Sequence, residues 1–90
     1  MNAQQENILD DAILLALSAN HTRFGLGAGA IRLQARAFGG GRATEEEVAG
    51  RLEYLTEKGL AEEVDKTVHK SLRAWKISDG GRRYLDEHNL

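Results

Sequence analysis

The hydrophobic period of this chain changes at Gly59, and that change constrains the fold more than any other feature. Before it, apolar residues recur at the spacing of one helix face, at Val48, Leu52 and Leu55. After it, apolar and polar residues alternate over 60–64 and again over 72–78, with the polar stretch 65–69 between them. A helix followed by two short alternating segments predicts an α+β domain in which a β-hairpin packs on helices.

The helix that precedes the hairpin has recognisable signals at both ends. The run Thr44-Glu-Glu-Glu47 fits a capping box, in which the threonine hydroxyl and the Glu47 side chain each accept a backbone amide proton. Glu47 also precedes Arg51 by four residues, in the order that favours an ion pair along one helix. Gly59 suits the left-handed position after a helix, with Leu60 folding back as the hydrophobic contact.

Three further helices are predicted from apolar repeats. They span about 4–19, 28–38 and 82–89, and the capped helix spans 44–58. Glycines 39–41 end the second helix, Ser78-Asp79 is expected to form a turn or cap, and Gly80-Gly81 is expected to turn the chain into the last helix. Leu14 projects from the polar arc of the first helix, so we expect either another element or a second copy of the chain to cover it.

The chain is long enough for one small domain, and it has no cysteine to cross-link it. Its 90 residues carry a formal net charge of -2, which argues against a generally basic nucleic-acid coat. Residues 44–65 contain two basic and eight acidic side chains, whereas residues 66–90 contain six basic and three acidic ones. The sequence has neither an apolar run of about 20 residues nor a basic signal-peptide region at its start, so we expect a cytoplasmic protein.

No residue pattern predicts catalysis, a metal centre or a cofactor. The histidines His21, His69 and His88 stand in different segments without a partner at metal-ligand spacing. The serines stand in a helix or in the hairpin rather than at a nucleophile elbow. The run 25–30 matches the pattern G-x-G-x-x-A of dinucleotide-binding loops, but a helix precedes it and the chain is too short for the parallel sheet. We therefore interpret the match as coincidence and expect a protein that is not an enzyme.

The element order resembles a winged helix-turn-helix domain. The matching residues are Val48-x3-Leu52-x2-Leu55-x3-Gly59-Leu60, followed by Trp75-Lys76-Ile77-Ser78-Asp79-Gly80-Gly81-x3-Leu85. This pattern is similar to the core and turn signature of MarR-like and PadR-like domains, and it covers about residues 28–86. The resemblance implies a single winged-helix domain over 1–90, with a three-helix core, a hairpin wing over 60–78 and a C-terminal helix.

The resemblance also implies double-stranded DNA as a partner and a small transcriptional regulator or accessory factor as the function. The helix 44–58 would be the recognition helix, with base-facing positions at Thr44, Glu45, Glu46, Ala49, Gly50 and Glu53. These positions offer no arginine or asparagine for bidentate contacts to bases, and their carboxylates repel DNA. We therefore expect phosphate contacts mainly from the wing, within the set Arg32, Arg36, Arg42, Lys66, His69, Lys70 and Arg73. An alternative is that the wing cations, with Lys76 beside them, keep the hairpin edge from pairing with other strands.

The acidic outer face of the predicted recognition helix supports a second hypothesis. Here the chain is a protein-interaction module that binds a basic protein partner through Glu46, Glu53, Tyr54 and Glu57. A homodimer is expected separately, with its seam on the first and last helices and on Leu14. The sequence identifies neither a cognate DNA site nor an effector.

Overall fold

A computed structural model of the chain describes residues 2–20, 24–64 and 73–90. Its helices are α1 (Ala3–Ala19), α2 (Ala28–Ala35), the short 3-10 helix η1 (Arg36–Phe38), α3 (Glu45–Glu57) and α4 (Asp79–Glu87). Its strands are β1 (Ala61–Val64) and β2 (Ala74–Ile77), which stand between α3 and α4. The predicted α+β fold, with three helices, a β-hairpin and a C-terminal helix, is confirmed.

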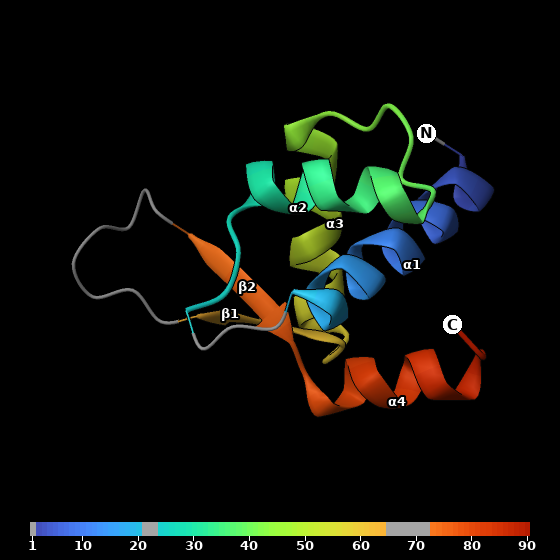
Figure 1. The fold of residues 1–90 in the computed structure, drawn as a ribbon, viewed down its shortest axis with the longest axis vertical. Coiled ribbons are helices and arrows are strands. Elements are labelled where there is room, and N and C mark those ends of the chain that lie inside the picture. The colour runs from blue at the N-terminus through green and yellow to red at the C-terminus, as the bar shows by residue number, and fades with distance from the viewer. Residues whose placement is uncertain (1, 21–23, 65–72) are drawn as a thin grey trace.

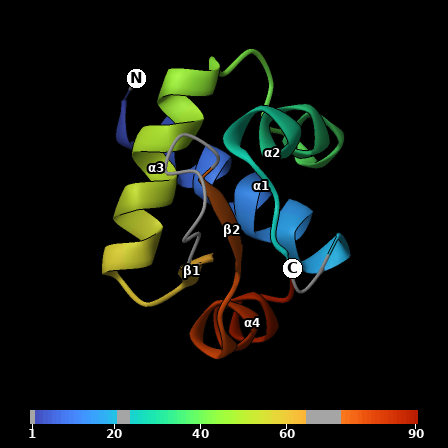
Figure 2. The ribbon, with the colours of Figure 1, turned by 90° about the vertical axis from the view of Figure 1, so that its left-hand side faces the viewer.

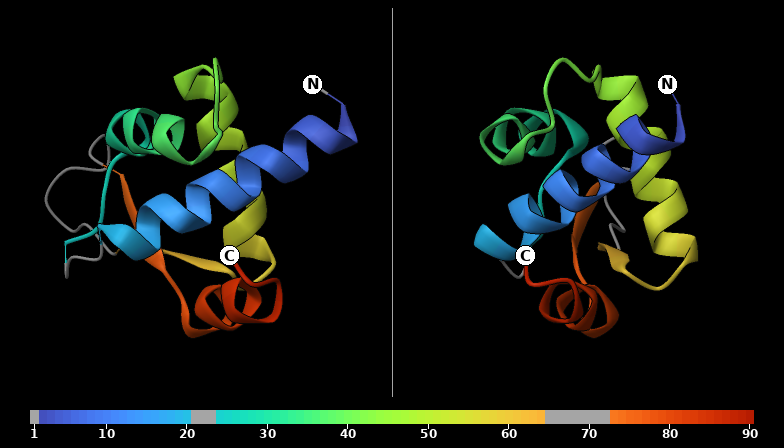
Figure 3. Two further views of the ribbon diagram at one scale, coloured as in Figure 1. Left: turned by 45° about the vertical axis from the view of Figure 1, so that its right-hand side comes forward. Right: turned by 90° about the vertical axis from the view of Figure 1, so that its right-hand side faces the viewer.

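The helices and the hairpin surround one apolar core (Figure 1). Viewed from the hairpin side, α3 and α2 flank β2, with α1 behind it and α4 beneath (Figure 2). The views of Figure 3 show α4 running below α1, so the last helix closes the lower end of the core. The largest fully buried side chains come from α1, α2 and α3: Ile13, Leu14, Leu17, Ile31, Val48, Leu52 and Leu55.

Leu14 is fully buried within the chain itself. Its place in the core answers the question that the sequence leaves open, because other elements of the same chain cover it. The expectation that Leu14 belongs to a seam between two copies is therefore wrong.

No helix in the described ranges has the length and apolar character needed to cross a membrane.

The two strands pair antiparallel, in a register that sets Ala61 opposite Ile77 and Val64 opposite Ala74. Trp75 and Ile77 are buried in the core, as the alternation over 72–78 predicts. The strands are shorter than the predicted segments 60–64 and 72–78, and the predicted polar tip 65–69 lies outside the described residues.

A third segment pairs with the hairpin, and the sequence analysis does not predict it. The backbones of Leu26 and Trp75 exchange two hydrogen bonds of 2.8 Å, in an isolated antiparallel bridge on the edge of β2 that β1 leaves open. At Gly25 the backbone has φ 73°, and a Cβ atom there would lie 2.7 Å from Val64 Cγ2 and 2.8 Å from the Trp75 oxygen. Close backbone packing therefore requires glycine at this position.

Both ends of α3 are built as predicted. The Glu47 amide donates to Thr44 Oγ1 at 3.1 Å, and the Thr44 amide donates to Glu47 Oε1 at 2.9 Å. After the helix, Gly59 has φ 77° and the Leu60 amide donates to the Leu55 oxygen at 2.9 Å, which is the Schellman pattern. A second capping box, between Asn2 and Gln5, starts α1 and is not predicted.

The last helix begins earlier than predicted, at Asp79 rather than at residue 82. Ser78 caps it, because its hydroxyl accepts the Gly81 amide at 3.0 Å and donates to the Gly59 oxygen at 2.6 Å. Gly80 and Gly81 form the first helical turn instead of a preceding turn. A Cβ on Gly81 would collide with the Leu60 oxygen, so these glycines let the helix approach the end of α3.

Candidate functional site

Arg73, the one predicted wing cation in the described ranges, is held by two carboxylates. Its Nε and Nη2 atoms donate to the two oxygens of Glu63, each at 2.9 Å, and its Nη1 donates to Glu53 at 3.1 Å. The guanidinium also lies over the Trp75 ring, 4.8 Å from its centre. Glu63, and then Glu53, raise the pKa of Arg73, while Arg73 lowers the pKa of the Glu63 carboxyl. Three of the five guanidinium N–H groups are therefore already bound to carboxylates, which a phosphate would have to displace.

The rest of the predicted wing set lies outside the described residues: Lys66, His69 and Lys70. Lys76, the neighbour of that set on β2, lies 3.7 Å from Glu62 of β1. Both described cations of the hairpin therefore pair with carboxylates of β1 or α3. Within residues 61–64 and 73–77, the two cations and the two carboxylates of the hairpin balance in charge.

The remaining arginines predicted to contact phosphate lie between α2 and the start of α3. Arg32 lies on α2, Arg36 begins η1 four residues later, and Arg42 lies in the loop that leads to α3. Figure 1 shows α2 and this loop at the end of the molecule opposite α4. Arg36 and Arg42 are exposed and Arg32 is half-buried. Among the described residues, no carboxylate forms an ion pair with these three side chains, which we call the arginine set. Of the predicted cations in the described ranges, these are the ones whose charge remains available.

The outer face of α3 is acidic, as predicted. Glu46, Glu53 and Glu57 are exposed, and we call these three residues the acidic face. Glu53 is bound to Arg73, while Glu46 and Glu57 have no ion pair within the described part of the chain. Of the other predicted base-facing residues, Thr44 is engaged as the cap of the helix, and the exposed Glu45 carboxylate lies near Gly29 of α2.

Arg51 joins α3 to α1, and sequence analysis misses this contact. Its Nε and Nη2 atoms donate to the two oxygens of Asp10, each at 2.8 Å, and its Nη1 donates to Glu6 at 2.8 Å. The predicted pair of Arg51 with Glu47 does not form, because the guanidinium is directed to Asp10 and Glu6 on α1. Glu6 and Asp10 are four residues apart and therefore lie on the same face of α1. This spacing is the sequence signal that could have indicated an arginine partner from another helix.

Tyr54 lies beside this contact and is 40% exposed. The Arg51 guanidinium sits over its ring, 4.3 Å from the centre, and Lys58 lies 5.6 Å from it. The ring therefore already carries cation–π contacts on a surface that is otherwise acidic. Tyr54 shares α3 with the exposed glutamates Glu53 and Glu57.

The outer faces of α1 and α4 border a second candidate surface. The Tyr84 hydroxyl donates to Asp11 at 2.7 Å, and this hydrogen bond, with burial, raises the pKa of Tyr84 to about 12. A cavity of about 370 Å³ lies between α1, η1 and α4, with Leu15, Phe38 and Leu90 in its walls. Phe38 and Leu90 are 38% and 49% exposed. This surface contains the apolar area that a partner could cover.

The described residues contain no group of three or more histidine, cysteine or acidic side chains placed to hold a metal ion. His88 stacks on Tyr84, with ring centres 4.1 Å apart, and its Nδ1 lies 2.8 Å from the Tyr84 backbone oxygen. His21 and His69 lie outside the described ranges. Searches against protein-family models, curated proteins and solved structures find no match to this chain, so its own geometry carries the functional argument.

Proposed function

We propose that this chain is a winged-helix protein that binds double-stranded DNA, and that the arginine set makes its main phosphate contacts. The element order supports the scaffold, and the isolated bridge at Leu26 places a third backbone segment beside β2. The observation that carries the proposal is that some of the predicted phosphate-binding cations are paired with carboxylates and others are not. Arg32, Arg36 and Arg42 keep their charge available, whereas Arg73 is bound by carboxylates.

Binding of this kind is electrostatic and tolerant of sequence. Each phosphate that an arginine neutralises releases counterions, and this steepens the dependence of affinity on salt by about 0.9 per contact. The acidic face of α3 opposes deep entry into the major groove, and Arg51, the arginine of α3, is engaged with Asp10. The proposed contact therefore follows the DNA backbone and carries little base readout.

The test is fluorescence anisotropy with a short labelled duplex at about 50 mM salt, where non-specific affinities are in the micromolar range. The variant R32Q/R36Q should weaken binding about tenfold and flatten the salt dependence. The matched control R82Q/R83Q removes the same charge from exposed positions on α4 and should have a much smaller effect. Absence of binding at about 100 µM protein, or equal losses in both variants, would overturn the proposal.

A second candidate function is favoured by the pairing of the two cations in the described part of the hairpin. With Arg73 and Lys76 paired, the surface formed by Glu46, Glu57 and the edge of Tyr54 suits a basic protein segment. A short arginine-rich peptide is the probe. E46Q/E57Q should weaken peptide binding, D86N/E87Q on α4 should not, and a peptide that binds both variants equally removes this candidate.

We also propose that the chain forms a homodimer through the apolar surface of α1, η1 and α4. Its support is the exposed apolar area at Phe38 and Leu90 beside the cavity. Sedimentation at about 100 µM should give a dimer for the natural chain and a monomer for F38S. The control L33S changes an exposed leucine of α2 and should leave the dimer intact, and a monomeric natural chain contradicts the proposal.

A further inference from the structure

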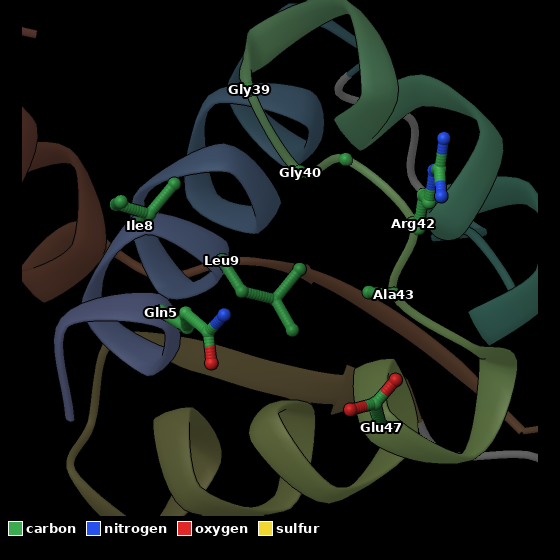
Figure 4. Close-up of a pocket in the computed structure, with 9 residues that line it drawn as sticks. Gln5, Ile8, Leu9, Gly39, Gly40, Arg42, Ala43 and Glu47 are labelled. Atoms are coloured by element: carbon green, nitrogen blue, oxygen red, sulfur yellow. The ribbon is translucent and has the colours of Figure 1, made fainter. Parts of the chain in front are cut away.

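A cavity of about 450 Å³ opens between the start of α1, the glycine turn 39–41 and the start of α3 (Figure 4). Leu9 and Ile8 of α1 give it an apolar floor and side wall, and Ile8 is 47% exposed. The opposite wall is formed by three glycines, two of them with φ 95° and 62°. That wall presents backbone rather than side chains, which leaves the cavity open to solvent and within the size range of small-ligand sites.

Two polar side chains face each other across this apolar floor. Figure 4 shows the Gln5 amide and the Glu47 carboxylate on either side of Leu9, one from α1 and one from α3. The Gln5 side-chain oxygen accepts a hydrogen bond from the Asn2 backbone amide. The NH2 group of the Gln5 side chain therefore has donors left for another molecule. Glu47 uses Oε1 for the Thr44 amide, and its second oxygen has no hydrogen-bond partner within the described residues. The cavity thus offers a donor and an anionic acceptor on opposite sides.

Arg42 stands at the rim of the same cavity. Its exposed guanidinium has no carboxylate partner in the described part of the chain, and Figure 4 shows it pointing away from Glu47. A long, exposed arginine side chain turns at little cost, so its charge can reach a ligand at the mouth. The cavity therefore combines a negative group at one wall, a positive group at the rim and an apolar floor.

We propose that this cavity binds a small α-amino acid with an aliphatic side chain. The ammonium group pairs with Glu47, the carboxylate takes the Gln5 NH2 group and Arg42, and the aliphatic tail packs on Leu9 and Ile8. A simple carboxylic acid lacks a partner for Glu47, and a simple amine lacks one for Arg42. Because the charged groups are exposed to water, their pairing is weak and the expected dissociation constant is in the millimolar range.

The first experiment titrates the natural chain with L-leucine and follows its amide resonances. Saturable shifts should appear at Gly39, Gly40 and Gly41 and at the Gln5 side-chain amide. N-acetyl-leucine lacks the ammonium group and leucinamide lacks the carboxylate. The affinity of each should be lower than that of L-leucine by a factor of about five or more. Absence of saturable shifts with L-leucine at about 20 mM overturns the proposal, and so does N-acetyl-leucine binding as tightly as leucine.

The second experiment uses a variant that keeps the fold. E47Q retains the capping box, since glutamine serves at that position, but it removes the charge that would hold the ammonium. It should weaken leucine binding about fivefold or more, while the neighbouring control E46Q should bind leucine as the natural chain does. Equal affinities for E47Q and E46Q overturn the assignment of Glu47. Neither experiment uses DNA, so its outcome is separate from that of the proposed function.

Discussion

Two arginines in this molecule make almost the same contacts in different surroundings. Arg51 and Arg73 each hold one carboxylate with two hydrogen bonds and a second carboxylate with one. The Arg51 side chain is 18% exposed beside Asp10 at 10%, whereas Arg73 is 42% exposed between Glu63 at 39% and Glu53 at 62%. Similar geometry therefore has different consequences, because burial decides how much a broken pair costs.

The difference assigns the two arginines different roles. Arg51 fixes the packing of α3 on α1, and its loss leaves the mostly buried Asp10 carboxylate without a partner. Arg73 is more exposed to water, so salt screens its ion pairs more strongly. The first contact belongs to the fold, and the second tunes the charge of the surface.

The largest expected effect is that of R51M on stability. Removing the guanidinium should lower the free energy of unfolding by about 2 kcal/mol, because the mostly buried Asp10 carboxylate loses both hydrogen bonds. Urea denaturation measures the change. The double variant R51M/D10N should recover part of the loss, and a change below about 0.5 kcal/mol in R51M would show that burial does not separate the two arginines.

A hydrogen bond from an uncharged donor sharpens the comparison between the two arginines. Tyr84 on α4 donates to Asp11 on α1, and its pKa is raised to about 12. Because the folded state holds this proton more tightly than the unfolded chain, the contribution is complete below about pH 10. It should disappear as the pH rises from about 10 to about 12. Thermal unfolding against pH should show this decline in the natural chain and a smaller one in Y84F.

The third prediction concerns DNA affinity. E53Q/E63Q removes the carboxylates that hold Arg73, so its guanidinium becomes available to phosphate. Affinity for a short duplex should rise about threefold, and the salt dependence should steepen by about 0.9. The control E45Q/E46Q makes the same change in net charge without releasing Arg73. If both variants gain equally, general charge explains the effect and Arg73 has no special part in it.

The smallest effect is expected for R73M on stability. Exposed pairs contribute little, so the free energy of unfolding should change by less than about 0.5 kcal/mol at moderate salt. Because Arg73 lowers the pKa of Glu63 in the folded state, their pairing contributes stability at pH values above the ordinary glutamate pKa. This contribution is lost as the pH falls through the pKa that Glu63 has in the folded state. Acid unfolding curves of R73M and the natural chain should therefore converge at low pH. A persistent difference would contradict this assignment.

The fold could be predicted because local signals agree with the tertiary structure along most of the chain. The period change at Gly59, the capping box at Thr44 and the burial of Trp75 all depend on residues close in sequence. The start of α4 could not be predicted in the same way. Glycine is a poor helix former, and its presence at Gly81 is explained by the approach of Leu60, which is distant in sequence.

The candidate sites depend more strongly on contacts that sequence order conceals. The partners of Arg73 lie 10 and 20 residues away, and Asp10 lies 41 residues from Arg51. Charge counting identified the acidic face of α3, but it could not show which cations were already paired. The cavity beside Leu9 brings together α1, the glycine turn and α3, so no single segment contains its signature.

The Leu26 bridge has a consequence for solubility. Because it occupies one edge of β2, β1 supplies the outer edge that remains open in the described part of the sheet. That edge strand contains two adjacent glutamates, Glu62 and Glu63, and extends over four residues. A strand from a neighbouring molecule would have to align its backbone beside these charged side chains and the cations that pair with them, Lys76 and Arg73. Charged side chains on an edge strand oppose its pairing with other chains, so β1 is a poor template for intermolecular β-aggregates.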